Sequence, residues 1–408
     1  MTAKIKLNAA SGGGSVSIVA PTSTTSNANI ELKLPIADGS SEQVIKTDGS
    51  GNLSFGQAVT AKNLAINGAM NVAQYGSSMA TGDGFAVDRF KLEINGTNEN
   101  PTLTQADVAS GTTPYTLGFR KSWKVQNGNQ TGGAGTTDRI QMQYRFEAQD
   151  IANSGWNYTS SSSYITLQFW VKSSVAQNFY GVFQTADGTA QNYPFETGSL
   201  TADTWTKVTK TISGNSNLTF DNDNEEGLKL ELHMFKGTDY TASGVTLNTW
   251  AAYASGTRTP DQTSTWYTTN DATLEITGVQ LEVGSSASAF AHETFADTFR
   301  KCQRYLFVLD LGTNSNAISI MLHRRNYNAG IPYGYLQLPV PMRDNPSMTK
   351  EGSSYTGTGY QTTITLSNSV KTGVSFYGSD STERGETSFH RVDTAGGSSL
   401  RYLFSAEL

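Results

Sequence analysis

Residues able to carry acid–base, nucleophilic or metal chemistry are few and scattered in this chain of 408 residues. The four histidines stand far apart: His233, His292, His323 and His390. The sequence contains no HExxH zinc motif, no GxSxG nucleophile turn and no phosphate-binding loop. Its single cysteine, Cys302, falls on an apolar helical face, where a buried thiol is expected. The sequence therefore predicts no catalytic residue and no cofactor.

One dense acidic cluster, DNDNEEG, is the exception, and it begins at Asp221. Oxygen-rich loops of this kind can bind calcium, and two carboxylates at a defined separation across a cleft can hydrolyse a glycosidic bond. The EF-hand spacing fails because Glu226 occupies the position that requires glycine. The sequence favours a solvated loop, and it leaves a structural calcium open. The candidate ligands are Asp221, Asp223 and Glu225.

Aromatic residues in polar loops offer a different chemistry, which is the recognition of sugars. Six rings lie in such loops: Trp156, Tyr158, Trp250, Tyr253, Trp266 and Tyr267. The C–H faces of sugars pack on aromatic rings, while amide and hydroxyl side chains bind the sugar hydroxyls. We expect these rings to be exposed and to be candidate glycan contacts. The alternative is that they fill subunit contacts or pin long loops to the body of the protein.

Strands are expected to position these loops, because apolar and polar residues alternate through much of the chain. The segments YITLQFWVK (residues 164–172) and GLKLELHMF (residues 227–235) alternate cleanly. Such alternation gives one dry face and one wet face, as in antiparallel sheets packed as a sandwich. Trp170 departs from the pattern and is expected on the outer face or at a bulge. The irregular strand spacing predicts a mainly β fold with a jelly roll.

A domain junction is predicted in residues 274–309, where alternation gives way to helical spacing. Four apolar residues fall on one helical face: Phe295, Phe299, Cys302 and Leu306. Thr294 can cap this helix, and Asp297 completes an approximate capping box. We therefore expect a jelly-roll β-sandwich over residues 61–292, a short connecting helix over residues 293–309 and a C-terminal β domain over residues 310–408.

Residues 1–60 read as short strand pairs joined by Asp-Gly turns. A segment with so few apolar side chains buries too little surface to fold comfortably as a single copy. We therefore expect this thin attachment or stalk segment to associate, with several copies sharing one core.

Composition excludes several partners. The net charge is −6 and no long basic run is present, so nucleic acid is not an expected partner. The first residues lack the apolar core of a secretion signal, and no run approaches the roughly 18 apolar residues of a membrane span. We expect synthesis in a cytoplasm and no membrane insertion.

Several segments resemble those of phage tail proteins. ELKLPIADGSSEQVIKTDGSGNLSFG (residues 31–56) resembles a segment of phage tail fibres. The strings Ile66-Asn67-Gly68, Gln74-Tyr75-Gly76 and Asp88-Arg89-Phe90 resemble the opening of a β-sandwich module in those proteins, which is similar to the carbohydrate-binding jelly rolls of glycan-degrading enzymes. Met70 and Phe90 stand where that pattern carries an aromatic residue and tryptophan. KCQRY (residues 301–305) and LPVPMRDNPS (residues 338–347) resemble its terminal domain, with family strings close to CQRYY and FPVPMRxxPT.

The resemblance implies a homotrimeric fibre or spike located in a virion. Its N-terminal segment would attach to another virion protein, and its outer domains would bind a host-surface glycan or another receptor without chemistry. Two alternatives stay open. One is a structural head or tail fibre or decoration protein with no receptor, and the other is a polysaccharide depolymerase. A secreted bacterial lectin is less well supported, because no export signal is seen.

Overall fold

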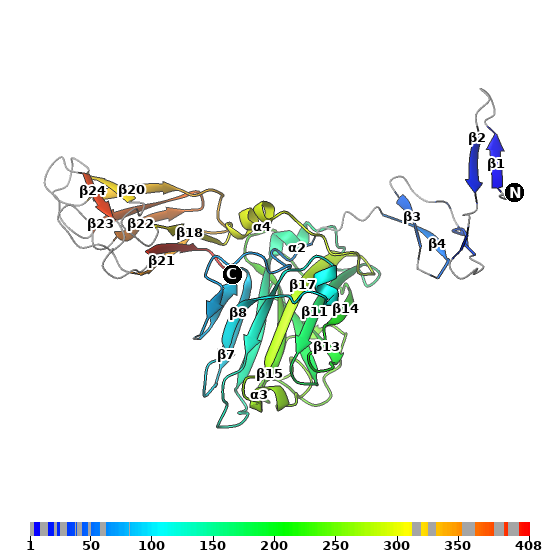
Figure 1. The fold of residues 1–408 in the computed structure, drawn as a ribbon, viewed down its shortest axis with the longest axis horizontal. Coiled ribbons are helices and arrows are strands. Elements are labelled where there is room, and N and C mark those ends of the chain that lie inside the picture. Colours follow the sequence, from blue (N-terminus) through cyan, green and yellow to red (C-terminus); the bar gives the residue numbers. More distant parts are fainter. Residues whose placement is uncertain are drawn as a thin grey trace. The chain divides into compact units, whose positions relative to one another are not determined.

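The computed structural model divides into two compact units, Met1–Thr60 and Ala61–Leu408 (Figure 1). It describes residues 4–8, 15–19, 23–24, 31–36, 38, 43–47, 50–57, 63–80, 82–311, 320–324, 332–352, 364–378, 387–390 and 400–408. The described residues are mainly in β-strands, and the sheets are antiparallel, as the alternation predicted.

The described residues of the first unit form two separate strand pairs. β1 (Lys4–Asn8) pairs with β2 (Ser15–Val19), and β3 (Gln43–Thr47) pairs with β4 (Leu53–Gln57). None of the residues whose burial is described in this unit is buried. Six large apolar side chains in this unit are exposed: Leu32, Leu34, Ile36, Val44, Ile45 and Phe55. A single copy of the unit therefore leaves most of its described apolar side chains in water.

The second unit contains a β-sandwich. Its seven-stranded sheet has the order β16 (Ala251–Ala252), β13 (Gln191–Ser199), β12 (Asn178–Thr185), β15 (Glu226–Lys236), β10 (Arg139–Glu147), β7 (Phe90–Asn95) and β6 (Gly84–Val87). Its six-stranded sheet has the order β14 (Thr206–Ser213), β11 (Tyr164–Ser173), β17 (Thr273–Val283), β9 (Lys121–Gln126), β8 (Thr102–Asp107) and β5 (Ser78–Met79). The chain crosses repeatedly between the sheets, as in a jelly roll.

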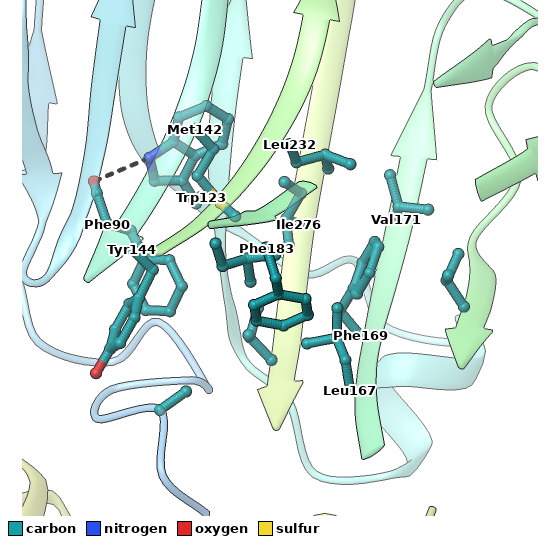
Figure 2. Close-up of a cluster of buried hydrophobic side chains, with 14 of the residues drawn as sticks. Phe90, Trp123, Met142, Tyr144, Leu167, Phe169, Val171, Phe183, Leu232 and Ile276 are labelled. Carbon is teal, nitrogen blue, oxygen red and sulfur yellow. Dashed lines mark hydrogen bonds between the residues drawn. The ribbon is translucent and has the colours of Figure 1, made fainter. Parts of the chain in front are cut away.

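The two sheets enclose one hydrophobic core, which Figure 2 shows in part. Alternate residues of each strand point inward, so Leu232 of β15 and Phe183 of β12 meet Ile276 of β17 there. Trp123 is fully buried, and its indole N–H donates to the carbonyl of Phe90 at 3.2 Å. The hydrogen bond removes the cost of burying that polar group. The same alternation sends the intervening residues to the outer faces.

Three short helices lie in the connections of the sandwich: α1 (Thr113–Thr116), α2 (Ala148–Ala152) and α3 (Thr265–Thr268). The fourth helix, α4 (Phe295–Cys302), follows the sandwich. As predicted, the hydroxyl of Thr294 caps it and accepts from the backbone N–H of Asp297 at 3.2 Å.

The connecting helix is shorter than the predicted 293–309. β18 (Leu306–Asp310) begins soon after it, because this apolar segment pairs with β25 (Arg401–Ser405). Leu306 is therefore a buried strand residue and not part of the helix face. Cys302 is buried as expected, whereas Phe295 is 59% exposed.

The C-terminal domain has a second, smaller core, which includes Phe376 and Phe404. A three-stranded sheet contains β18, β25 and β21 (Ser347–Glu351). A five-stranded sheet contains β22 (Ile364–Val370), β23 (Gly373–Gly378), β20 (Pro332–Gln337), β19 (Ile320–Arg324) and β24 (Thr387–His390).

Candidate functional site

Four of the six predicted glycan-contact rings are buried, so the expectation that they are exposed is wrong. They are Trp156, Trp250, Trp266 and Tyr267. The indole N–H of Trp250 donates to the carbonyl of Ser213 at 2.8 Å, and that of Trp266 donates to the carbonyl of Thr273 at 3.1 Å. The hydroxyl of Tyr267 donates to Asp138 at 2.9 Å. These rings pin loops to the sandwich, which is the alternative reading of the sequence.

The other two rings are partly exposed, and they lie apart from each other. Tyr158 packs edge-on against Phe220 with ring centroids 4.9 Å apart, next to the buried Trp156. Its ring therefore supports a loop of the core. The hydroxyl of Tyr253 accepts from Arg258 at 2.7 Å, beside the seven-stranded sheet.

The acidic cluster forms an exposed turn next to α2. The carboxylate of Asp223 accepts from the backbone N–H of Glu225 at 3.0 Å, and the carbonyls of both residues accept from the N–H groups that begin α2. Asp221 is exposed and its N–H donates to Asp187. Among the described residues, no three histidine, cysteine or acidic side chains come together where they could hold a metal ion.

Strand register assembles a different candidate site on the outside of the seven-stranded sheet. Gln141 of β10 stands opposite His233 of β15, and His233 stands opposite Tyr180 of β12. One step along the strands, Gln143 stands opposite Glu231. We call this surface the outer polar face. Its members are Glu93, Gln141, Gln143, Tyr180, Gln184, Asn192, Lys229, Glu231 and His233.

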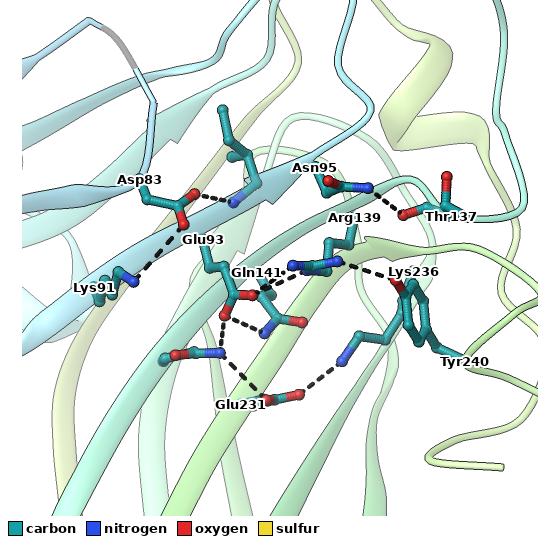
Figure 3. A network of polar contacts seen from close by, with 12 residues as sticks. Asp83, Lys91, Glu93, Asn95, Thr137, Arg139, Gln141, Glu231, Lys236 and Tyr240 are labelled. Atoms are coloured by element: carbon teal, nitrogen blue, oxygen red, sulfur yellow. Dashed lines mark hydrogen bonds and ion pairs between the residues drawn. The ribbon is translucent and has the colours of Figure 1, made fainter. Parts of the chain in front are cut away.

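Glu93 organises one part of the outer polar face (Figure 3). It forms an ion pair with Arg139 at 2.8 Å and accepts from the amide of Gln141 at 3.1 Å. The amide nitrogen of Gln143 donates to Glu93 and, at 3.3 Å, to Glu231. One glutamine amide therefore bridges two carboxylates that belong to different strands.

Glu231 organises the other part, and it is fully buried. It pairs with Lys236 at 2.7 Å and with Lys229 at 3.1 Å. The Nε2 atom of His233 lies 3.1 Å from the same carboxylate, and Gln262 donates to Nδ1 at 3.0 Å. The Nε2 atom therefore faces both the Glu231 carboxylate and, at 3.2 Å, the Nζ atom of Lys236.

The charge states in this network follow from burial and pairing. Burial alone would raise the pKa of Glu231, but Lys236, His233 and Lys229 together hold it well below its usual range. Burial, aided by the nearby Lys236 charge, lowers the pKa of His233 to about 4. Burial also lowers the pKa of Lys236, to about 8, against the attraction of Glu231. At neutral pH the network holds an ionised glutamate and a neutral histidine.

Hydrogen-bonding capacity is left over at one side of the outer polar face. The side-chain oxygen of Gln184 and both polar side-chain atoms of Asn192 have no hydrogen-bond partner within the described part of the chain. The two residues are direct cross-strand neighbours on β12 and β13. Tyr180 lies on the same strand and face as Gln184 and is partly exposed. Amide groups and an aromatic ring on one face of a sheet are suited to a polyhydroxyl ligand that runs along the strand.

Motif residues of the predicted junction lie elsewhere, in a joint between the sandwich and the C-terminal domain. Arg304, from KCQRY, donates two hydrogen bonds of 2.7 and 2.6 Å to the buried carboxylate of Glu147. The next residue, Tyr305, donates to the same carboxylate at 2.5 Å. Burial alone would raise the pKa of Glu147, but the hydrogen bonds from Arg304 and Tyr305 lower it. The motif therefore neutralises a buried acid of the sandwich.

The other motifs meet at the same joint. Arg343, from LPVPMRDNPS, donates to the carbonyls of Ala406 and Asn224 at 2.8 and 2.9 Å. The guanidinium of Arg89, from the Asp-Arg-Phe string, lies 3.4 Å from the ring centroid of Tyr305 and donates to Glu407. KCQRY, LPVPMRDNPS and the Asp-Arg-Phe string thus hold two domains together, and the outer polar face lies outside them.

Comparisons with known proteins come from structures only. No protein-family model matches the chain, and no curated protein matches it either. The enzymatically active domain of bacteriophage CBA120 tailspike protein 4 is 10% identical, with a TM-score of 0.29, over 54% of this chain and 21% of that chain. The match thus spans about a fifth of the tailspike chain.

Two carbohydrate-binding domains give similar values. The N-terminal cellulose-binding domain of Cellulomonas fimi β-1,4-glucanase C is 10% identical over 53% of this chain and 99% of that chain, with a TM-score of 0.25. The family 11 carbohydrate-binding module of Clostridium thermocellum is 10% identical over 53% and 98%, with a TM-score of 0.24. These values are too low to assign the chain to a family or an activity. No helix among the described residues is long and apolar enough to cross a membrane.

Proposed function

We propose that this chain is a fibre or spike protein of a phage particle and that it binds a host-surface glycan through the outer polar face. The observation that carries the glycan site is the partly exposed ring of Tyr180 on the same face as Gln184 and Asn192, whose buried amide atoms lack hydrogen-bond partners among the described residues. An amide side chain binds hydroxyls in both directions, as donor and as acceptor. The ring supplies a surface for sugar C–H groups.

The buried network beneath these residues gives the site a fixed shape. Glu231 and Glu93 are held by cations and amides from neighbouring strands. A ligand then meets side chains that are already ordered, which reduces the entropy lost on binding. The resemblance to phage tail proteins supplies the setting for this binding, which is a virion protein that faces the host surface.

Binding without cleavage is part of the proposal. Glu93 and Glu231 share the amide of Gln143, so this carboxylate pair is the feature that a depolymerase would require. Glycoside hydrolysis needs one carboxyl group that is protonated at the working pH. The three cationic or donor neighbours of Glu231 keep it ionised, which supports a binding role.

Self-association is also part of the proposal. The exposed apolar residues of the first unit, such as Leu34 and Ile36, favour a core shared between copies. Three linked sites can gain about 10²–10⁴ in avidity over one site when all of them bind together. The first unit would also provide the attachment to another virion protein.

The test is binding of the full chain to an array of bacterial surface polysaccharides. Tyr180→Ala and the double variant Gln184→Ala/Asn192→Ala should each weaken binding by about tenfold, because stacking or two hydrogen bonds are lost. Tyr164→Ala and Gln126→Ala are matched controls on the six-stranded sheet, and they should bind like the wild type.

Three results would contradict the proposal in different ways. Equal loss of binding in the control variants would mean that the outer polar face is not the contact surface. A steady shortening of the bound polysaccharide, abolished by Glu231→Gln, would show a depolymerase. No binding to any polysaccharide would favour the structural fibre without a receptor.

A further inference from the structure

The six-stranded sheet carries a separate cavity on its outer side. The cavity has a volume of about 210 Å³, and its lining includes Phe119, Trp170, Lys207, Ser288 and Phe290. It lies over β11, β14 and β17, which Figure 1 labels side by side. None of these residues belongs to the outer polar face. The cavity is therefore a second feature that glycan binding at that face does not use.

A register shift between β11 and β17 shapes the floor of this cavity. The shift falls between Gln168 and Trp170, so Trp170 lies on the outer side at a bulge, as both sequence readings allowed. Gly278 of β17 has a φ of +65°, which favours glycine. A Cβ atom there would lie 2.7 Å from the ring of Phe119. Glycine thus lets an aromatic ring approach the sheet and form one wall.

The segment that follows β17 forms another wall, and buried polar side chains hold it in place. Gln168 donates to the carbonyl of Ser288 at 2.8 Å, and Glu282 accepts from the N–H of the same residue at 2.8 Å. Gln280 accepts from the N–H of Ala291 at 2.8 Å. All three side chains are at least nine-tenths buried. The wall is therefore fixed before any ligand binds.

The chemistry of the lining combines aromatic rings with one cation. Phe119 and Phe290 pack edge-to-face with ring centroids 4.8 Å apart. Lys207 of β14 is the direct cross-strand partner of Trp170. It is exposed and forms no ion pair with any described residue. Phe119 is buried, whereas Trp170 and Phe290 are partly exposed. An ammonium group beside such rings attracts an anion that also has an apolar surface.

We propose that this cavity binds one acidic sugar ring, with its C–H face on Trp170 and its carboxylate on Lys207. The size supports a single ring, because about 210 Å³ is below the roughly 300–1,000 Å³ of sites for larger ligands. The charge supports an acidic sugar, because Lys207 has no carboxylate partner in the part of the chain that the structure describes. The site is independent of the proposed glycan contact at the outer polar face.

The test uses the full chain and methyl α-D-glucuronide as the probe, with methyl α-D-glucoside as its uncharged counterpart. Saturation-transfer NMR should detect the glucuronide at millimolar concentration. Trp170→Ala should abolish this signal, and Lys207→Gln should weaken binding by about tenfold through loss of a charge-assisted hydrogen bond. Added salt should weaken binding to the wild type and should have little effect on Lys207→Gln.

Matched controls separate the site from the general surface. Lys124→Gln removes another lysine from the outer side of the same sheet, and Trp205→Ala removes a partly buried tryptophan outside the cavity. Both should bind the glucuronide like the wild type. The proposal is overturned if the glucoside binds equally well, if the glucuronide does not bind, or if the controls lose binding. Variants of Tyr180, Gln184 and Asn192 should leave this signal intact. The two proposed sites are therefore tested independently.

Discussion

His233 shows how a single side chain couples the outer polar face to pH. Burial and the Lys236 charge lower its pKa in the folded protein to about 4, whereas the unfolded value is near 6.5. A histidine with a lowered folded pKa contributes stability that is fully present above pH 6.5 and is lost as the pH falls toward 4. Protonation would place a second charge beside Lys236 in a buried network.

We therefore expect His233→Gln to remove a pH-dependent part of the free energy of unfolding. Between pH 6.5 and 4 the wild type should lose up to about 3 kcal/mol from this group. Urea unfolding at a series of pH values measures the difference between the two proteins. The difference is the useful quantity, because burial raises the pKa of Asp88 to about 6 and gives a slope of the opposite sign. Parallel curves for the variant and the wild type would contradict this assignment.

The positions of individual side chains were the least predictable feature of the sequence. Trp266 sits in a polar loop, yet its ring turns inward because the indole N–H finds the carbonyl of Thr273. Loop composition does not reveal that choice. Part of the outer polar face can be found in the sequences RIQMQYRF and KLELHMF. The alternation that identifies the residues facing the core also places Gln143 and Glu231 on the opposite face. Their pairing depends on strand register, which the sequence does not show.

At the scale of elements, α4 and the strands around it explain why KCQRY and LPVPMRDNPS occur together. Arg304 neutralises the buried Glu147, and Arg343 binds the chain on both sides of the joint. The helix cap at Thr294 was predictable, because capping is a local interaction between neighbours. The C-terminal end of the helix was not predictable, because it depends on the pairing of β18 with the distant β25.

Arg304→Ala should destabilise the joint strongly. It leaves the Glu147 carboxylate buried with no cationic partner, which costs about 3–5 kcal/mol in comparable buried pairs. Arg300→Ala is a matched control from the helix that precedes Arg304, because its side chain is 69% exposed. Calorimetry should show a lower unfolding temperature for Arg304→Ala only. If the two variants unfold at the same temperature, the Arg304–Glu147 pair does not hold the joint.

At the scale of the whole molecule, the alternation of apolar residues predicted two antiparallel sheets around one core, and the structure confirms this. The prediction succeeded because Leu228, Leu230 and Leu232 must share a face whichever strand pairs with them. The order of strands was not predictable. It depends on contacts between residues as far apart as Asn63 and Val279, which form a hydrogen bond of 2.9 Å.

The first unit supports the last prediction, which concerns the number of copies. Leu32, Leu34 and Ile36 are 61%, 76% and 106% exposed, although side chains of this type gain about 1.5–3 kcal/mol each on full burial. Sedimentation equilibrium should therefore give a mass near three times 43.8 kDa for the full chain. Substitution of these three residues by serine should shift the mass toward 43.8 kDa.

Leu117→Ser is the control for this loss of association, because it removes an exposed leucine from the second unit. It should leave the mass unchanged. A wild-type chain that stays monomeric at micromolar concentration would remove the avidity from the proposed mechanism. Each glycan contact would then have to act alone, and the single-site affinity of the outer polar face would have to be correspondingly higher.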